Sequence, residues 1–184
     1  FRANVTNNYF RNLYFYLMNL EEVIRLNTDA ATKTEMANVS GDNNAQIATA
    51  MILRAAIIQM MTDCWGAIPY SQAFKPLQYP TPAYDSQADI YAALIAELKQ
   101  AATLIGTTTS AWDAGGDIIY GGDMTKWKKF ANSLRLRLAV RMNRVSPASA
   151  NTEALAAIAD GVFTSNDDNA VFNFIKDGTP NAAP

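Results

Sequence analysis

The spacing of apolar residues predicts a long helix in each of the first two hydrophobic stretches of the chain. Between about residues 5 and 27, apolar side chains recur at steps of three and four, on one face of an amphipathic helix: Phe10, Leu13, Tyr14, Leu17, Leu20 and Ile24. Residues 28–44 are polar and end in an Asn- and Asp-rich stretch that can cap a helix, so we expect a loop there. Residues 45–65 are apolar on most sides, which predicts a central helix between other helices.

Prolines, glycines and capping residues divide the rest of the chain. Residues 67–83 hold four of the seven prolines and are expected to form an irregular but stiff segment. Further helices are expected from Ser86 to about Gly106, from Asp123 or Thr125 to about Val145 with Pro147 closing it, and over 149–160. Residues 118–120 form a short strand or fill the core, and residues 170–175 are expected to form a strand. The pattern predicts an all-α array of helical hairpins.

A turn at residues 65–70 separates the predicted central helix from the proline-rich segment. Gly66 suits the end of a helix because glycine adopts positive φ without steric cost. Pro69 fixes its own φ and forces Ile68 into an extended conformation, so a helix cannot continue through it. We call residues 65–70 the Trp65 turn.

Composition and charge exclude several kinds of site. The 15 Lys and Arg residues nearly balance 17 Asp and Glu, so no global field attracts nucleic acid or an anionic membrane. The absence of histidine excludes Ser-His-Asp and Cys-His catalysis and histidine-ligated zinc. Cys64 has no partner for an internal disulfide and is expected to be a buried, unreactive side chain.

No membrane span is expected, because the run 47–61 is shorter than ~20 residues and is interrupted by Arg54 and Gln59. Arg54 is expected to reach a carboxylate or the solvent edge, with a ligand role as the alternative.

Three motifs in this order resemble the SusD/RagB family of Bacteroidetes outer-membrane lipoproteins: residues 62–73, residues 82–91, and residues 117–123 together with 127–141. The resemblance implies an all-α fold of tetratricopeptide-like helical hairpins with long irregular loops and little β-structure. It also implies a cell-surface protein of the outer membrane that captures glycans or other oligomeric nutrients. Such a protein passes its ligand to a SusC-type TonB-dependent transporter, catalyses no reaction and uses no cofactor.

The resemblance further implies that residues 1–184 are part of a single SusD-like domain, truncated at both ends, because family members are much longer and this chain begins with Phe1. The lipid-bearing cysteine of the family is absent here, so membrane contact is expected only through an upstream anchor. Family members often carry an acidic residue where Ala67 stands, which leaves no hydrogen-bonding role for that side chain. The alternative function is a helical-repeat scaffold that binds a protein and no glycan.

Exposed aromatic residues on loops are the candidates for ligand binding, because proteins bind sugars through aromatic faces supplemented by polar groups. Five residues qualify by location: Tyr79, Trp112, Tyr84, Trp65 and Tyr70. Packing is the favoured alternative for Trp65 and Tyr70, because their turn belongs to a signature shared by family members with different ligands. A ligand role is favoured more at Tyr79 and Trp112, which lie in less regular loop sequence.

Clusters of charged residues suggest other functions. Asp113, Asp117 and Asp123 raise the alternative of a glycoside hydrolase, which needs two carboxylates across the scissile bond, but capping and turn formation explain them better. Residues 166–169 resemble a calcium loop without its full pattern, so an Asx turn and no metal site are expected. A basic stripe is expected to be a solvated or salt-bridged face, with contact to the transporter as the alternative: Lys126, Lys129, Arg137, Arg141 and Arg144.

Overall fold

The computed structural model describes residues 3–106 and 115–172, and these form an all-α architecture, as predicted. The helices are α1 (Ala3–Thr28), α2 (Lys33–Ser40), α3 (Asn43–Trp65), α4 (Gln87–Ile105), α5 (Met124–Met142), α6 (Pro147–Ala159) and the short 3₁₀ helix η1 (Asn166–Asp168). Within the described residues, the β-structure consists of β1 (Ile68–Pro69) and β2 (Tyr84–Asp85). These two strands pair antiparallel, with Ile68 opposite Asp85 and Pro69 opposite Tyr84.

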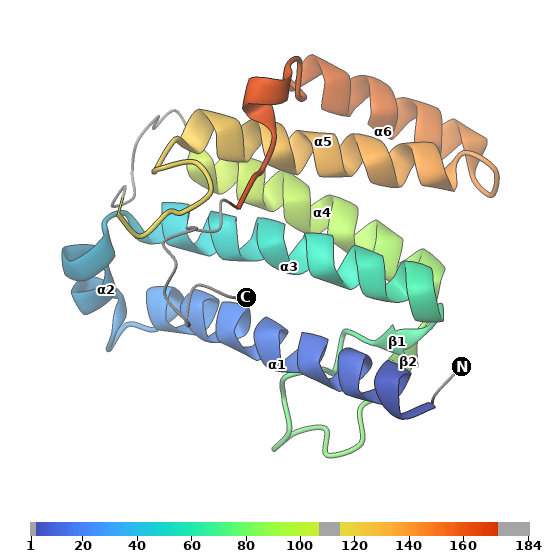
Figure 1. Cartoon of the computed structure of the whole chain (residues 1–184), viewed down its shortest axis with the longest axis horizontal. Helices are drawn as coiled ribbons and strands as arrows, with labels where there is room; N and C mark the ends of the chain where they lie inside the picture. Colours follow the sequence, from blue (N-terminus) through green and yellow to red (C-terminus); the bar gives the residue numbers. More distant parts are fainter. Residues whose placement is uncertain (1–2, 107–114, 173–184) are drawn as a thin grey trace, which may run out of the picture.

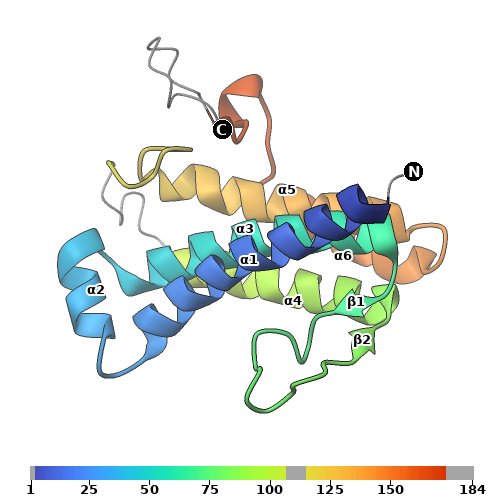
Figure 2. The same ribbon diagram turned by 60° about the horizontal axis from the view of Figure 1, so that its bottom comes forward.

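The long helices lie side by side in antiparallel succession, from α1 on one side of the molecule to α6 on the other (Figure 1). The helix α3 packs against both α1 and α4, α4 packs against α5, and α5 packs against α6. In Figure 2, the segment that joins β1 to β2 extends away from the helices, and α2 lies at the other end of α1. The successive pairs α3–α4 and α5–α6 are therefore the expected helical hairpins.

The core is centred on α3, as its sequence predicts. Ile52, Ile58 and Met61 of α3 are fully buried, and they belong to one hydrophobic cluster with Leu94 of α4 and Trp127 of α5. This helix has 23 residues, longer than the apolar run identified in the sequence, and by length and composition it could cross a membrane. Its central position in the bundle, where 56% of that stretch is buried, accounts for its apolarity instead.

Helix ends follow the capping residues closely. Asp42 accepts a hydrogen bond from the Ala45 amide, Ser86 accepts one from Asp89, and Asp123 accepts two from Thr125 and Lys126. Pro147 does not simply close α5, since it occupies the first turn of α6, where its missing N–H has no intrahelical partner to lose.

Three expectations about local structure are wrong or incomplete. The polar stretch 28–44 contains α2, which the apolar pattern missed because this helix buries none of its residues. Residues 118–120 form no strand; Ile119 and Tyr120 pack against the core, which was the stated alternative. Residues 170–172 form no strand, and residues 173–175 lie outside the described part of the chain.

Cys64 is exposed, contrary to the prediction that it is buried. Near the end of α3, the side chains of Met61 and Thr62 are buried, whereas Cys64 lies farther along the last turn. The apolar composition of this stretch therefore did not indicate which face of the final turn meets the core.

Candidate functional site

The Trp65 turn fixes the start of the proline-rich segment. Gly66 has φ of 74°, and its amide donates to the Thr62 carbonyl at 2.8 Å, which ends α3. The Thr62 hydroxyl donates in return to the Gly66 carbonyl at 2.6 Å. Ile68 is fully buried, so the chain leaves the helix with one side chain anchored in the core.

Asp85 fastens the two ends of this segment together. Its Oδ2 accepts hydrogen bonds from the Tyr70 and Ser71 amides, both at 2.9 Å, and its Oδ1 accepts one from the Ser71 hydroxyl at 2.7 Å. A further hydrogen bond joins the two ends, because Gln72 Oε1 accepts one from the Ala83 amide at 2.8 Å. Hydrogen bonds to the charged form lower the pKa of Asp85 against the opposing effect of burial. The proline-rich segment is thus a closed loop on a hydrogen-bonded base, and we call residues 70–83 the proline loop.

The proline loop and α1 enclose a groove of about 720 Å³. One stripe of α1 forms its first wall, because Tyr14, Met18, Glu21 and Arg25 follow one another at helical spacing. The proline loop forms the opposite wall with apolar side chains: Phe74, Pro76, Tyr79, Pro80 and Pro82. We call this space the α1 groove.

Aromatic rings inside the α1 groove are held in fixed orientations. The Tyr14 hydroxyl donates to the Pro69 carbonyl at 2.6 Å, and its ring lies 5.8 Å from that of Phe74 between centroids. Burial raises the pKa of Tyr14 well above its ordinary value, so this hydroxyl remains a donor. Phe74 has a positive φ of 62°, a conformation that costs energy in a residue with a side chain and that recurs at ligand-binding sites.

The predicted aromatic residues have different locations. Tyr79 is half-buried and lines the α1 groove, whereas Tyr84 on β2 is 67% exposed and is not among the lining residues. Trp65 packs against Tyr9 and Phe10, with ring centroids 6.0 and 5.1 Å away. Trp112 lies outside the described residues.

Tyr70 belongs to a buried polar cluster. Its hydroxyl donates to Glu97 Oε2 at 3.1 Å, and Glu97 Oε1 accepts from Arg54 Nε at 2.8 Å. Arg54 also pairs with Glu21 on α1, so the expectation that Arg54 reaches a carboxylate is confirmed. The packing interpretation therefore accounts for the contacts of Trp65 and Tyr70.

Most residues of the α1 groove were not predicted from the sequence. Tyr14 was expected in the core and packs against it, but it also lines the groove, and Phe74 and Glu21 were not considered as site residues. The helical spacing of Tyr14, Met18, Glu21 and Arg25 could have shown that they share a face, but nothing in it shows that the proline loop lies opposite.

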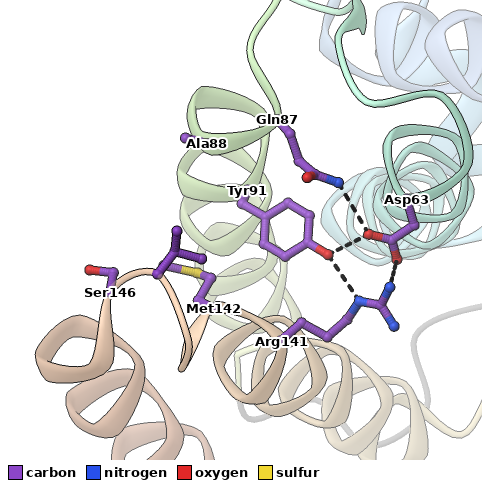
Figure 3. A pocket seen from close by; sticks show the side chains of 8 residues that line it. Asp63, Gln87, Ala88, Tyr91, Arg141, Met142 and Ser146 are labelled. Atoms are coloured by element: carbon purple, nitrogen blue, oxygen red, sulfur yellow. Dashed lines mark hydrogen bonds and ion pairs between the residues drawn. The ribbon is translucent and has the colours of Figure 1, made fainter.

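A second cavity, of about 680 Å³, lies where α3 ends and α4 begins, beside the end of α5 (Figure 3). There the Tyr91 hydroxyl donates to Asp63 Oδ1 at 2.5 Å, and Arg141 Nε donates to that hydroxyl at 3.1 Å. Arg141 also pairs with Asp63 Oδ2 at 3.1 Å, and Gln87 Nε2 donates to the Thr62 carbonyl at 2.9 Å. These polar groups bond to one another, so we interpret them as a clamp between three helices.

The acidic candidates for hydrolysis have structural partners. The Asp117 carboxylate accepts hydrogen bonds from three backbone amides and from Trp127 Nε1, and Asp123 caps α5. Asp113 lies outside the described residues. Residues 166–169 contain the capped turn η1, and no cluster of potential metal ligands occurs among residues 3–106 and 115–172.

Several residues of the predicted basic stripe have partners. Lys129 pairs with Asp168 at 2.9 Å, and Arg141 pairs with Asp63 as described above. Arg137 donates to Gln59 Oε1 at 2.9 and 2.6 Å. These contacts support the interpretation of the stripe as a bonded helix face.

Comparison with known proteins gives a consistent result. A family profile described as SusD-like, starch-binding and associating with the outer membrane matches residues 1–184. The structure is similar to that of a chitin-binding protein with 39% identity and a TM-score of 0.71, over 87% of this chain and 32% of that one. A SusD homologue from Bacteroides uniformis has 34% identity and a TM-score of 0.72, over 89% of this chain and 31% of that one.

A chitin-binding SusD homologue from Flavobacterium johnsoniae is 35% identical, with a TM-score of 0.63, over 78% of this chain and 32% of that one. The chain thus spans about a third of the length of these proteins. No curated protein matches it.

Proposed function

Because this chain belongs to the SusD-like family, whose profile it matches over residues 1–184, we propose that it is part of a surface glycan-binding lipoprotein of the outer membrane. In this proposal the protein captures oligosaccharides, or other oligomeric nutrients, and delivers them to a SusC-type TonB-dependent transporter. The family match is the observation that carries the proposal. The chitin-binding proteins similar to this chain support a glycan as the ligand.

We propose the α1 groove as a site of glycan contact. A half-buried tyrosine, a fixed phenylalanine and several proline rings offer apolar surface to the faces of sugar rings, and polar side chains at its edges can bond hydroxyl groups. Its walls are already held by the Asp85 base and by the Tyr14 hydrogen bond. A site fixed before binding loses little conformational entropy when the ligand enters.

The proposed mechanism is binding followed by transfer, without catalysis. The carboxylate of Asp117, which the hydrolase alternative requires as an acid or base, is 4% exposed and is surrounded by its four donors. Such a carboxylate is poorly placed to reach a glycosidic bond, so the structure favours binding over hydrolysis.

Calorimetry of the purified chain with chitin and starch oligosaccharides tests the glycan proposal. We expect binding of at least one of these ligands and a loss of about tenfold or more for Tyr79→Ala, because burying an aromatic side chain contributes about 1.5–3 kcal/mol. Tyr16→Ala is the matched control, since Tyr16 is a 60% exposed tyrosine of α1 that does not line the groove. Equal losses for both variants, or no binding by the wild-type chain, would argue against the groove.

Delivery to a transporter requires a separate experiment on the full-length protein. Gentle solubilisation of outer membranes followed by affinity purification is expected to recover a TonB-dependent transporter with it. Recovery of a stable complex with a different protein, combined with no oligosaccharide binding, would instead support the helical-repeat scaffold.

A further inference from the structure

We propose that Glu21 is the polar anchor of the α1 groove, that it accepts hydrogen bonds from hydroxyl groups of an uncharged oligosaccharide, and that the half-buried Arg54 positions it. This inference rests on the proposed glycan-binding function and deepens it by naming the polar contact and the class of sugar. It concerns a residue that forms no part of the aromatic surface described above.

Glu21 is placed where a ligand in the groove can reach it. It lines the α1 groove and also an adjoining hollow of about 370 Å³ that continues along α1 past Arg25 to Asp29. The two spaces together follow α1 from Phe10 to Thr28, about 27 Å at 1.5 Å per residue. An elongated site of this kind suits an oligomer, and Glu21 lies where its two parts meet.

The Glu21 carboxylate is held in one orientation while one oxygen stays available. Oε1 pairs with Arg54 Nη1, and among the described residues Oε2 has no hydrogen-bond partner. The Glu21 side chain is 29% exposed and that of Arg54 only 17% exposed, so their pairing is partly shielded from water. A carboxylate fixed in partly buried surroundings is a stronger hydrogen-bond acceptor than a mobile one on the surface.

Arg54 is fixed from its other side by Glu97, whose side chain is 6% exposed. Arg54 Nε donates to Glu97 Oε1 at 2.8 Å, and Tyr70 donates to the second oxygen of Glu97. The orientation of Glu21 therefore depends on side chains of α3, α4 and the proline loop, which makes Arg54 a positioning residue without ligand contact.

The negative charge of Glu21 favours an uncharged part of the ligand at this position. Glu21 and Glu97 share the single cation Arg54, and Glu22 and Asp29 share the single cation Arg25. Each cluster therefore has two carboxyl groups and one guanidinium, and burial raises the pKa of the Glu97 carboxyl above its ordinary value.

Among the described residues, three cations line the groove, Arg11, Arg25 and Lys75, and Arg11 and Lys75 keep their charge although each has a contact away from Glu21. Lys75 donates to the Ser71 carbonyl at 3.1 Å, and Arg11 lies 5.9 Å from the centroid of the Phe15 ring. An acidic sugar at Glu21 would place a second negative charge next to an existing one, which is unfavourable in partly buried surroundings.

Calorimetry of single-residue variants tests the role of Glu21. The ligands are N-acetylated chitohexaose, maltohexaose and the acidic hexamer of galacturonic acid. For the neutral hexamer that wild type binds, we expect Glu21→Gln to lower affinity at least tenfold and Arg54→Lys to lower it severalfold. Glu35→Gln, which changes an exposed carboxylate of α2 outside the groove, is expected to change affinity less than twofold.

A measurement on the wild-type chain guards against loss of folding in the variants. The ¹³C carboxyl resonance of Glu21 is expected to shift on addition of the neutral hexamer, and that of Glu35, outside the groove, to stay unchanged. Wild-type affinity in Glu21→Gln, an unmoved Glu21 resonance on binding, or tighter binding of the galacturonate hexamer would each overturn the inference while leaving glycan binding intact. Failure of wild type to bind any neutral hexamer would overturn the inference and the glycan proposal together.

Discussion

Replacing Asp117 with alanine is expected to destabilise the fold strongly, because this carboxylate organises the turn before α5. Oδ1 accepts the amides of Ile119 and Tyr120 at 3.0 and 3.1 Å. Oδ2 accepts the Gly122 amide at 2.9 Å and Trp127 Nε1 at 2.7 Å. These hydrogen bonds outweigh the effect of burial and lower the pKa of Asp117, so the group is ionised at neutral pH.

The expected loss of stability in Asp117→Ala depends on which of the four donors can bond to water once the carboxylate is gone. The Ile119 and Tyr120 amides are only partly buried and can bond water instead. The Gly122 and Trp127 bonds are buried, and a buried donor without a partner costs about 1–3 kcal/mol. Two such donors give an expected loss of about 2–6 kcal/mol, a large share of the ~5–15 kcal/mol that stabilises a typical domain.

Urea unfolding followed by tryptophan fluorescence measures this loss directly. Trp127 is a suitable probe because it is 1% exposed and lies in the core. Asp123→Ala serves as the control because Asp123 only caps α5, and loss of a cap costs about 0.5–2 kcal/mol.

An unfolding free energy for Asp117→Ala within about 0.5 kcal/mol of wild type would refute this reasoning, since changes of that size are usual for surface residues without a structural role. Loss of a hydrolytic activity with unchanged stability would do so as well, and it would restore the hydrolase alternative.

Two further predictions concern acid stability and the Trp65 turn. The Thr164 amide and Lys129 lower the pKa of Asp168 from 3.8 to about 2, so its contribution is present above pH 3.8 and is lost as the pH falls toward 2. Unfolding curves between pH 5 and 2 are expected to show a smaller acid-dependent loss for Asp168→Asn, and an unchanged pH profile would contradict this assignment. Gly66→Ala meets no atom within 4 Å but places a side chain at φ of 74°, so calorimetric unfolding is expected to show a loss of about 1–3 kcal/mol. Wild-type stability would show that the turn tolerates alanine.

Part of the candidate site could be predicted from the sequence. Tyr79 was a candidate because it is an aromatic residue on a loop of less regular sequence, and in the structure it lines the α1 groove. Packing was the favoured alternative for Trp65 and Tyr70, and both have contacts within the protein. Glu21 and Phe74 could not be identified, because their roles depend on α1 meeting the proline loop, about 50 residues later in the sequence.

The sequence by itself determined the long helices, their capping residues and the family. Apolar spacing, Asx and serine caps, and glycine and proline positions act within a few residues, so they can be read along the chain. It did not determine α2, which has no buried face, or the exposure of Cys64.

The tertiary structure alone decided which residues of distant elements meet. It placed α1 against the proline loop, joined Glu21 through Arg54 to Glu97, and assigned Asp117 to the Trp127 indole. The physical reason is that such contacts depend on how whole helices pack, and side-chain pairing between them leaves no periodic signal in the sequence of either one.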